Sequence, residues 1–199
     1  MDFDRAALSQ MQATAERYHE NLLLSAEHLL YLEGRGISEW LARQFLLGCC
    51  DDVHEGWLSI PYLRTAGTVW FNYRRMDEGK PKYMASGSKH LYNTADLELS
   101  DASGEVCIAE GELDTIIASA VCGLPCVGVP GATQWSGNRS WHELFRGYQR
   151  VSILADPDEA GLGLAQAIMD TLPAARLVKL PGDVTETYLQ HGDIKGFIK

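Results

Sequence analysis

The stretches VCIAEGELD (residues 106–114) and VSILADPDEAG (residues 151–161) decide the fold of this chain. Each begins with a continuous apolar run, typical of a strand buried on both faces, and runs directly into acidic residues. Helical patterns are expected at 112–120, 141–146 and 159–172, and further strands at 125–129 and 175–180. Strands that alternate with helices across short loops indicate βαβ units. The second half of the chain is therefore predicted to be α/β, a parallel sheet covered by helices.

The first half of the chain has a different pattern. Apolar side chains recur at spacings of three or four over residues 4–32, which predicts an amphipathic helix in two pieces. Ser38 is placed to cap a further helix that ends near Phe45. The β-rich runs at 57–63 and 68–74, separated by a short turn, predict a hairpin.

A polar, turn-rich stretch at 96–105 separates the two halves. We expect a smaller N-terminal α+β domain over residues 1–100, helical over 1–48 and β-rich and basic over 56–92. The parallel-sheet domain is expected over residues 101–199.

Composition excludes several classes of protein. The 199 residues are 46% hydrophobic, enough for a packed core, and their formal net charge of −10 argues against a simple basic nucleic-acid coat. No uninterrupted apolar run approaches the length of a membrane span, and the N-terminal residues lack the apolar core of a signal peptide. We expect a cytoplasmic protein with no membrane partner. Its five cysteines are expected to be reduced and to serve as small apolar residues.

Acidic residues follow three of the predicted strands, where ligands bind in parallel α/β sheets. Glu110 ends the first strand, and Asp114 lies in the first turn of the next helix. Asp156 and Asp158 follow the third strand, and Asp183 follows the fourth. All are oxygen donors, which favours Mg²⁺ or Mn²⁺ over zinc. The alternative is that each acid merely caps the helix after it, which is common for a single residue. Five like charges at one sheet edge weaken that alternative, because without a cation they repel one another.

The two acidic motifs, in this order and about 40 residues apart, resemble the TOPRIM domain of bacterial-type primases, topoisomerases and some nucleases. Residues upstream narrow the resemblance to the catalytic core of bacterial-type, DnaG-like primases. The similar segments are YLEGRGIS (31–38), FLLG (45–48), IP (60–61), GTVWFNYR (67–74), PKYMAS (81–86) and KHLY (89–92). Near Asp183 the family usually has Asp-Pro-Asp, whereas this chain has Thr185 in place of the second acid. The flanking domains of cellular primases are not seen here, so a minimal, phage-like version is expected.

The resemblance implies a DNA primase, which joins ribonucleoside triphosphates into short RNA primers on a single-stranded DNA template. It implies catalytic roles for Glu110, Asp114, Asp156 and Asp158, and metal binding by these four residues and Asp183. Mg²⁺ or Mn²⁺ is the implied cofactor. A helicase or a separate zinc-binding protein is a possible partner.

The positive charge expected of a template site is concentrated in residues 64–89, which hold six basic residues and two acids, a net charge of +4. By resemblance, the residues that hold template and nucleotides are Arg35, Arg74, Lys82 and Lys89. Singly, each is more often a solvated surface residue. Trp70, Tyr73 and Tyr83 interleave with the basic residues, as in a base-stacking surface, although strand packing explains Trp70 equally well.

Two other functions remain open at this point. A TOPRIM nuclease would share the acids but would not explain the upstream segments. A non-catalytic TOPRIM module that binds nucleic acid as a replication accessory is favoured by the change at Thr185 and by the net negative charge of the remaining chain.

Overall fold

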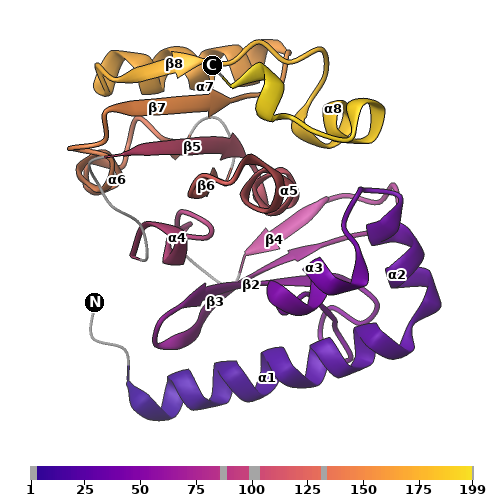
Figure 1. Ribbon diagram of the computed structural model, residues 1–199. Helices are drawn as coiled ribbons and strands as arrows, with labels where there is room; N and C mark the ends of the chain where they lie inside the picture. Colours follow the sequence, from indigo (N-terminus) through magenta and orange to yellow (C-terminus); the bar gives the residue numbers. More distant parts are fainter. Residues whose placement is uncertain (1–3, 86–88, 99–103, 131–133, 199) are drawn as a thin grey trace. The chain divides into compact units, whose positions relative to one another are not determined.

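The computed structural model describes residues 4–85, 89–98, 104–130 and 134–198 (Figure 1). The chain divides into two compact units, Met1–Ser88 and Lys89–Lys199. The boundary expected between residues 100 and 101 lies outside the described residues, and the second unit already includes the segment before it. Tyr92 forms a β-bridge with Gly128, and the Asp96 carboxylate accepts a hydrogen bond of 3.2 Å from the Cys126 backbone. These contacts fasten residues 89–98 to the second unit.

The first unit combines three helices with an antiparallel sheet. The helices are α1 (Arg5–Leu24), α2 (Ala26–Glu33) and α3 (Glu39–Gln44). The strands, in spatial order, are β1 (Gly48–Cys49), β2 (Leu58–Arg64), β3 (Gly67–Arg74) and β4 (Tyr83–Ala85). The predicted helix in two pieces and the predicted hairpin are both confirmed.

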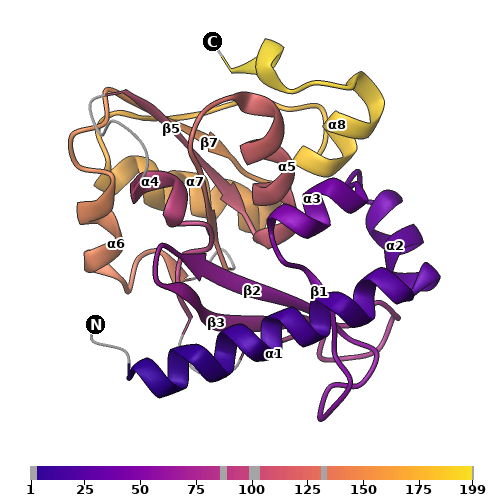
Figure 2. The ribbon, with the colours of Figure 1, turned by 60° about the horizontal axis from the view of Figure 1, so that its bottom comes forward.

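Serines set the helix boundaries in this unit. Ser25 lies between α1 and α2, and its side chain accepts the N–H of His28. Ser38 caps α3 by accepting the N–H of Leu41 at 3.3 Å, as the sequence predicted. The apolar face of α1 buries Tyr18 and Leu22, and Figures 1 and 2 show this helix running along the sheet.

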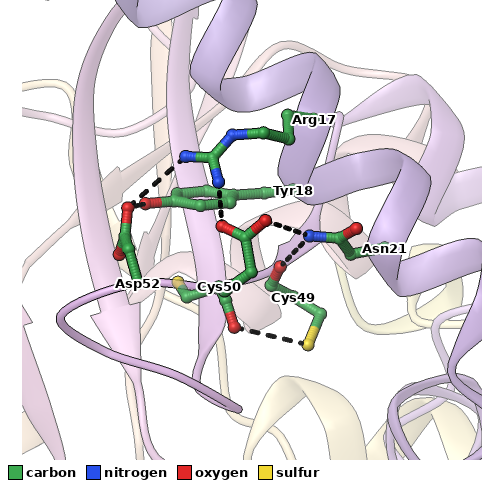
Figure 3. A network of polar contacts seen from close by, with 7 residues as sticks. Arg17, Tyr18, Asn21, Cys49, Cys50 and Asp52 are labelled. Atoms are coloured by element: carbon green, nitrogen blue, oxygen red, sulfur yellow. Dashed lines mark hydrogen bonds and ion pairs between the residues drawn. The ribbon is translucent and has the colours of Figure 1, made fainter.

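A polar network fastens α1 to the segment after β1 (Figure 3). Arg17 forms ion pairs with Asp51 and Asp52, and the Tyr18 hydroxyl donates to Asp52. Asn21 donates to the other Asp51 oxygen at 3.0 Å. Every charged group in this network has a partner of opposite charge or a hydrogen-bond donor.

The second unit is built on a parallel sheet. Its strands, in spatial order, are β6 (Cys126–Val129), β5 (Glu105–Glu110), β7 (Arg150–Leu154) and β8 (Ala175–Leu177). The helices are α4 (Ala95–Glu98), α5 (Glu112–Cys122), α6 (Arg139–Leu144), α7 (Glu159–Thr171) and α8 (Val184–His191), followed by a 3₁₀ turn, Lys195–Phe197. The predicted α/β class is confirmed. The α8 helix was not predicted, and β8 ends before the expected position.

Helices cover both faces of this sheet, as the apolar strands predicted. Figures 1 and 2 show α5 and α7 on opposite sides of β5 and β7. On the α7 side, Ile168 joins Val106 and Ile108 in one fully buried cluster. Trp135 belongs to the same cluster and is completely buried, so it is a core residue. The carboxyl ends of β5 and β7 therefore remain as the place where polar side chains can gather.

The cysteines are free thiols, and four of the five are buried, as expected for small apolar residues. Among the described residues, no helix has the length and apolar character needed to cross a membrane.

Candidate functional site

The five predicted acids lie where β5, β7 and the chain after β8 lead into helices; we call them the acidic edge. The residues are Glu110, Asp114, Asp156, Asp158 and Asp183. Glu110 is the last residue of β5. Asp156 lies two residues after β7, which pairs with β5 up to Ala109 and Leu154. The other three acids belong to the N-terminal ends of α5, α7 and α8.

Glu110 and Asp156 are both partly buried and both have raised pKa values. Burial raises the pKa of Glu110 to about 7, helped by the charges of Asp156 and Asp158, while a hydrogen bond from the Asp156 backbone acts in the opposite direction. Burial also raises the pKa of Asp156 to about 6, with further contributions from Asp183, Asp158 and Glu186. The two carboxyls thus titrate near neutral pH, where a group can both accept and release a proton.

Asp114 is fixed by a residue from another helix. Burial raises the pKa of Asp114 to about 7, against hydrogen bonds from Thr185. The Thr185 backbone N–H and hydroxyl donate to Asp114 Oδ1 at 3.2 and 2.5 Å. Thr185 was noted in the sequence only as a missing acid, and its contact with Asp114 was not predicted.

Asp158 and Asp183 are helix caps, as the alternative interpretation expected of each acid separately. Asp158 Oδ1 accepts the N–H of Gly161 at 2.8 Å at the start of α7. Asp183 Oδ1 accepts the N–H of Glu186 at 2.7 Å at the start of α8. Capping engages one oxygen of each carboxylate in these bonds. It also places both side chains beside the strand ends, where they act electrostatically on Asp156.

The acidic edge has no compensating cations among the residues that the structure describes. None of its five carboxylates forms an ion pair with a described lysine, arginine or histidine. Like charges therefore accumulate with partial burial, an arrangement that costs folding free energy and is common at functional sites.

Two features of these residues fit a divalent cation. The donors are all carboxylate oxygens, which hard cations prefer. Glu110 Oε2 is buried and has no hydrogen-bond partner, so a ligand there would satisfy it. As they stand in the described part of the chain, no three His, Cys, Asp or Glu side chains lie close enough together to hold an ion.

The two glycines of the motifs have different roles. Gly111 takes a φ of +76° between β5 and α5, a conformation that side-chain-bearing residues rarely adopt. At Gly161, which follows Asp158 by three residues, a Cβ would overlap the Asp156 backbone. Gly161 is thus required by close packing of α7 on the Asp156 segment.

Glu186 is an acid that the sequence reasoning left unassigned. Its Oε2 lies 2.5 Å from where a Cβ on Gly182 would be, so the side chain folds back toward the start of α8, and its charge acts on Asp156. Its signal in the sequence is its spacing of three residues from Asp183, which places both in the first turn of one helix.

The basic residues expected to hold template and nucleotides do not lie in one unit. Arg35, Arg74 and Lys82 belong to the first unit, and Lys89 belongs to the second, where its Nζ donates to the Pro130 carbonyl at 3.2 Å. Lys82 is exposed. The structure thus divides the basic segment between the two units.

Arg74 differs from the expected surface cation because it is only 4% exposed. Its Nε donates to the Tyr31 hydroxyl at 2.7 Å, and its guanidinium lies 4.9 Å from the centre of the Tyr83 ring. Arg35 lies over the Tyr31 ring at 5.7 Å. Arginine and tyrosine side chains therefore alternate across α2, β3 and β4, and Tyr83 keeps 38% of its surface exposed. Tyr73 instead packs against Phe71 and His54.

Solved structures with this fold define its class. The chain superposes on a DnaG primase catalytic domain bound to ssDNA with a TM-score of 0.76, at 21% identity over 94% of this chain and 76% of that one. It superposes on the zinc-binding and RNA polymerase domains of the Aquifex aeolicus primase with a TM-score of 0.78, at 22% identity over 96% of this chain and 60% of that one. The protein has the fold of a DnaG-type primase catalytic core.

A sequence relative places the chain in a family. The "Gene 57 protein" of Mycobacterium phage D29 is 46% identical over 138 residues, which cover 65% of this chain and 86% of that protein. The chain belongs to the family of that phage protein. No protein-family model matches the sequence.

Proposed function

We propose that the protein is a DNA primase, which synthesises short RNA primers from ribonucleoside triphosphates on single-stranded DNA. The observation that carries this proposal is the acidic edge, because its partly buried and uncompensated carboxylates occupy the strand ends of a DnaG-type core. In this proposal the second unit works as a TOPRIM domain. A helicase or a separate zinc-binding protein is a candidate partner.

The reaction forms one bond and breaks another. The 3′-hydroxyl oxygen of one nucleotide attacks the α-phosphorus of the next, and the bond from that phosphorus to the β-phosphate bridging oxygen breaks, so that pyrophosphate leaves. The hydroxyl proton must go to a base. Glu110 fits this role because its pKa of about 7 lets it accept a proton near neutral pH and release it again.

The remaining acids would hold Mg²⁺ or Mn²⁺. Asp114, Asp156, Asp158 and Asp183 offer carboxylate oxygens from three segments, and Glu110 Oε2 is a further donor. When bound, such an ion neutralises phosphate charge and orients the attacking hydroxyl. Asp158 and Asp183 are held by their capping bonds, so their free oxygens keep a defined direction.

The first unit would supply template and nucleotide contacts. In this proposal the exposed Lys82 contacts phosphates, and Arg35, half-buried over Tyr31, lies beside the template. Tyr83 offers a partly exposed ring for stacking. Arg74 acts behind that surface, since it supports Tyr31 and Tyr83 from a buried position.

The test is primer synthesis by the purified protein on single-stranded DNA with labelled ribonucleoside triphosphates and Mg²⁺ or Mn²⁺. We expect short RNA products that disappear in Asp156→Asn and Glu110→Gln. The matched control is Asp170→Asn, an exposed aspartate at the other end of α7, which should retain synthesis. If the template is cleaved and no RNA is made, the protein is a nuclease and the proposed function is wrong. If the protein binds DNA tightly but shows neither activity, it acts as a non-catalytic replication accessory.

A further inference from the structure

Thr185 makes two hydrogen bonds to one carboxylate oxygen. Its backbone N–H and its hydroxyl both donate to Asp114 Oδ1, at 3.2 and 2.5 Å. The two residues are 71 positions apart in the sequence, one in the first turn of α5 and the other in the first turn of α8. Thr185 is itself buried, with 5% of its surface exposed. The contact therefore joins two helices at the acidic edge.

The first turn of α8 has free N–H groups, as every helix start does, and they are divided between two acceptors. The N–H of Glu186 bonds to Asp183 Oδ1 at 2.7 Å, within the same turn. The N–H of Thr185 is directed instead to α5. The hydroxyl adds a second donor at the same oxygen, and such bonds to a charged acceptor are stronger than bonds between neutral groups.

The two bonds leave the other Asp114 oxygen available. Both go to Oδ1, and no described residue donates a hydrogen bond to Oδ2. Asp183 and Asp156 lie near enough to act on the charge of Asp114. A carboxylate that is anchored at one oxygen holds the other in a fixed direction.

We propose that Thr185 is a positioning residue, which orients Asp114 so that its Oδ2 binds the divalent cation. This inference rests on the proposed function, in which Asp114 is a ligand. It assigns Thr185 a role as donor rather than as a substitute for an acid. A carboxylate at this position would face Asp114 Oδ1 with no proton to donate and would repel it.

The test measures binding of Mn²⁺ itself, by electron paramagnetic resonance of the free ion in titrations of the full chain. Thr185→Val and Thr185→Ala remove the hydroxyl donor, and we expect Mn²⁺ to bind about tenfold more weakly. Thr185→Ser restores the donor and should bind within about twofold of the native protein. Thr185→Asp should bind no better than Thr185→Ala. Each variant's melting temperature shows whether it is folded.

Thr187→Val is the matched control, since Thr187 is also buried in α8 but its hydroxyl makes only a 3.5 Å contact with the Gly182 carbonyl. It should bind Mn²⁺ as the native protein does. Where primer synthesis is detected, raising the metal concentration should restore the rate of Thr185→Ala, because the defect lies in metal affinity. A folded Thr185→Ala with native affinity overturns the positioning role, as does a native protein that binds no Mn²⁺. If the native protein binds Mn²⁺ but makes no primers, only the proposed function is overturned. The role of Thr185 is then decided by the Mn²⁺ affinities of its variants.

Discussion

Charged side chains are paired in the network on α1 of the first unit and, among the described residues, unpaired at the acidic edge of the second unit. In the first unit, Arg17 pairs with Asp51 and Asp52 (Figure 3). Arg75 likewise pairs with Asp77. The second unit gathers five carboxylates at the strand ends, none with a described cationic partner. Pairing lowers the pKa of Asp77 to about 2, whereas burial and crowding raise the pKa of Glu110 to about 7.

This contrast separates structural charge from functional charge. A paired carboxylate stabilises the fold in its ionised form, so its removal should cost stability. A crowded, partly buried carboxylate destabilises the fold when ionised, and its retention needs another reason. We infer that the reason lies in the ligand or reaction that these acids serve, and each prediction below tests one side of the contrast.

The largest effect is expected from exchanging an acid for its amide in each unit. Asp156→Asn should lower primer synthesis by at least about a hundredfold, because a group at the reacting centre matters more than those that only support it. The same change should preserve or raise the melting temperature of the metal-free protein, since it removes repulsion. Asp52→Asn should instead lower the melting temperature and leave the activity unchanged, because it weakens the network with Arg17 and Tyr18.

Activity assays and thermal melts of both variants check this contrast. An equal loss of activity in the two variants would contradict the distinction between structural and functional charge. A marked fall in the melting temperature of Asp156→Asn would contradict it as well.

The second prediction concerns Arg74, which belongs to the structural side although the sequence suggested a template contact. Arg74→Met should reduce the free energy of unfolding by about 1–3 kcal/mol, because Tyr31 and Tyr83 lose a buried charged partner. Lys82→Met, at a nearby exposed position, should change it by less than about 0.5 kcal/mol. Urea unfolding measures both. If Arg74→Met is as stable as the native protein and only binds DNA more weakly, Arg74 contacts the template, as the sequence suggested.

Arg74 also shows where sequence reasoning ends. The strand that carries it was predicted from β-rich periodicity, and the positions of Glu110 and Asp156 followed from parallel-sheet topology. The burial of Arg74 depends on Tyr31, which is 43 residues away and belongs to a helix. The bond between Thr185 and Asp114 likewise depends on how α8 packs against α5. Periodicity reports which face of an element is apolar, but it does not report which distant polar group will meet it.

The first turns of α7 and α8 mark a second limit. Asp158 and Asp183 were recognised as candidate ligands and, alternatively, as caps, and the structure shows that they are caps. The two roles use different oxygens of the same carboxylate, so local sequence cannot separate them. Glu186 remained unassigned because the α8 helix was not predicted. Its spacing of three residues from Asp183 places the two acids together only if the segment is helical.

The third prediction concerns pH. The folded-state pKa values of Glu110, Asp114 and Asp156, about 7, 7 and 6, lie above their ordinary values near 4. The stability that these groups contribute is therefore fully present below about pH 4 and is lost as the pH rises toward 7. Glu110→Gln should accordingly raise the melting temperature of the metal-free protein more at pH 8 than at pH 5, by a few degrees.

Glu20→Gln provides the comparison, because Glu20 is an exposed glutamate of α1 far along the sequence from the acidic edge. Its effect should be small and equal at the two pH values. Melts in a chelator at pH 5 and pH 8 measure the difference. A stabilisation by Glu110→Gln that is the same at both values would show that Glu110 is not crowded in the folded protein.

The smallest effects belong to the paired charges of the first unit, and here burial decides the order. Tyr18 is 2% exposed, so Tyr18→Phe removes a buried hydroxyl donor to Asp52, which then keeps only its 3.4 Å contact with Arg17, and the change should cost about 1 kcal/mol. Arg17 has 47% of its side chain exposed, so Arg17→Met should cost less, and 1 M salt should remove most of its effect. Urea unfolding at low and high salt measures both. A larger and salt-sensitive loss for Arg17→Met than for Tyr18→Phe would mean that the charge of Arg17, rather than the buried hydroxyl, holds α1 to the segment after β1.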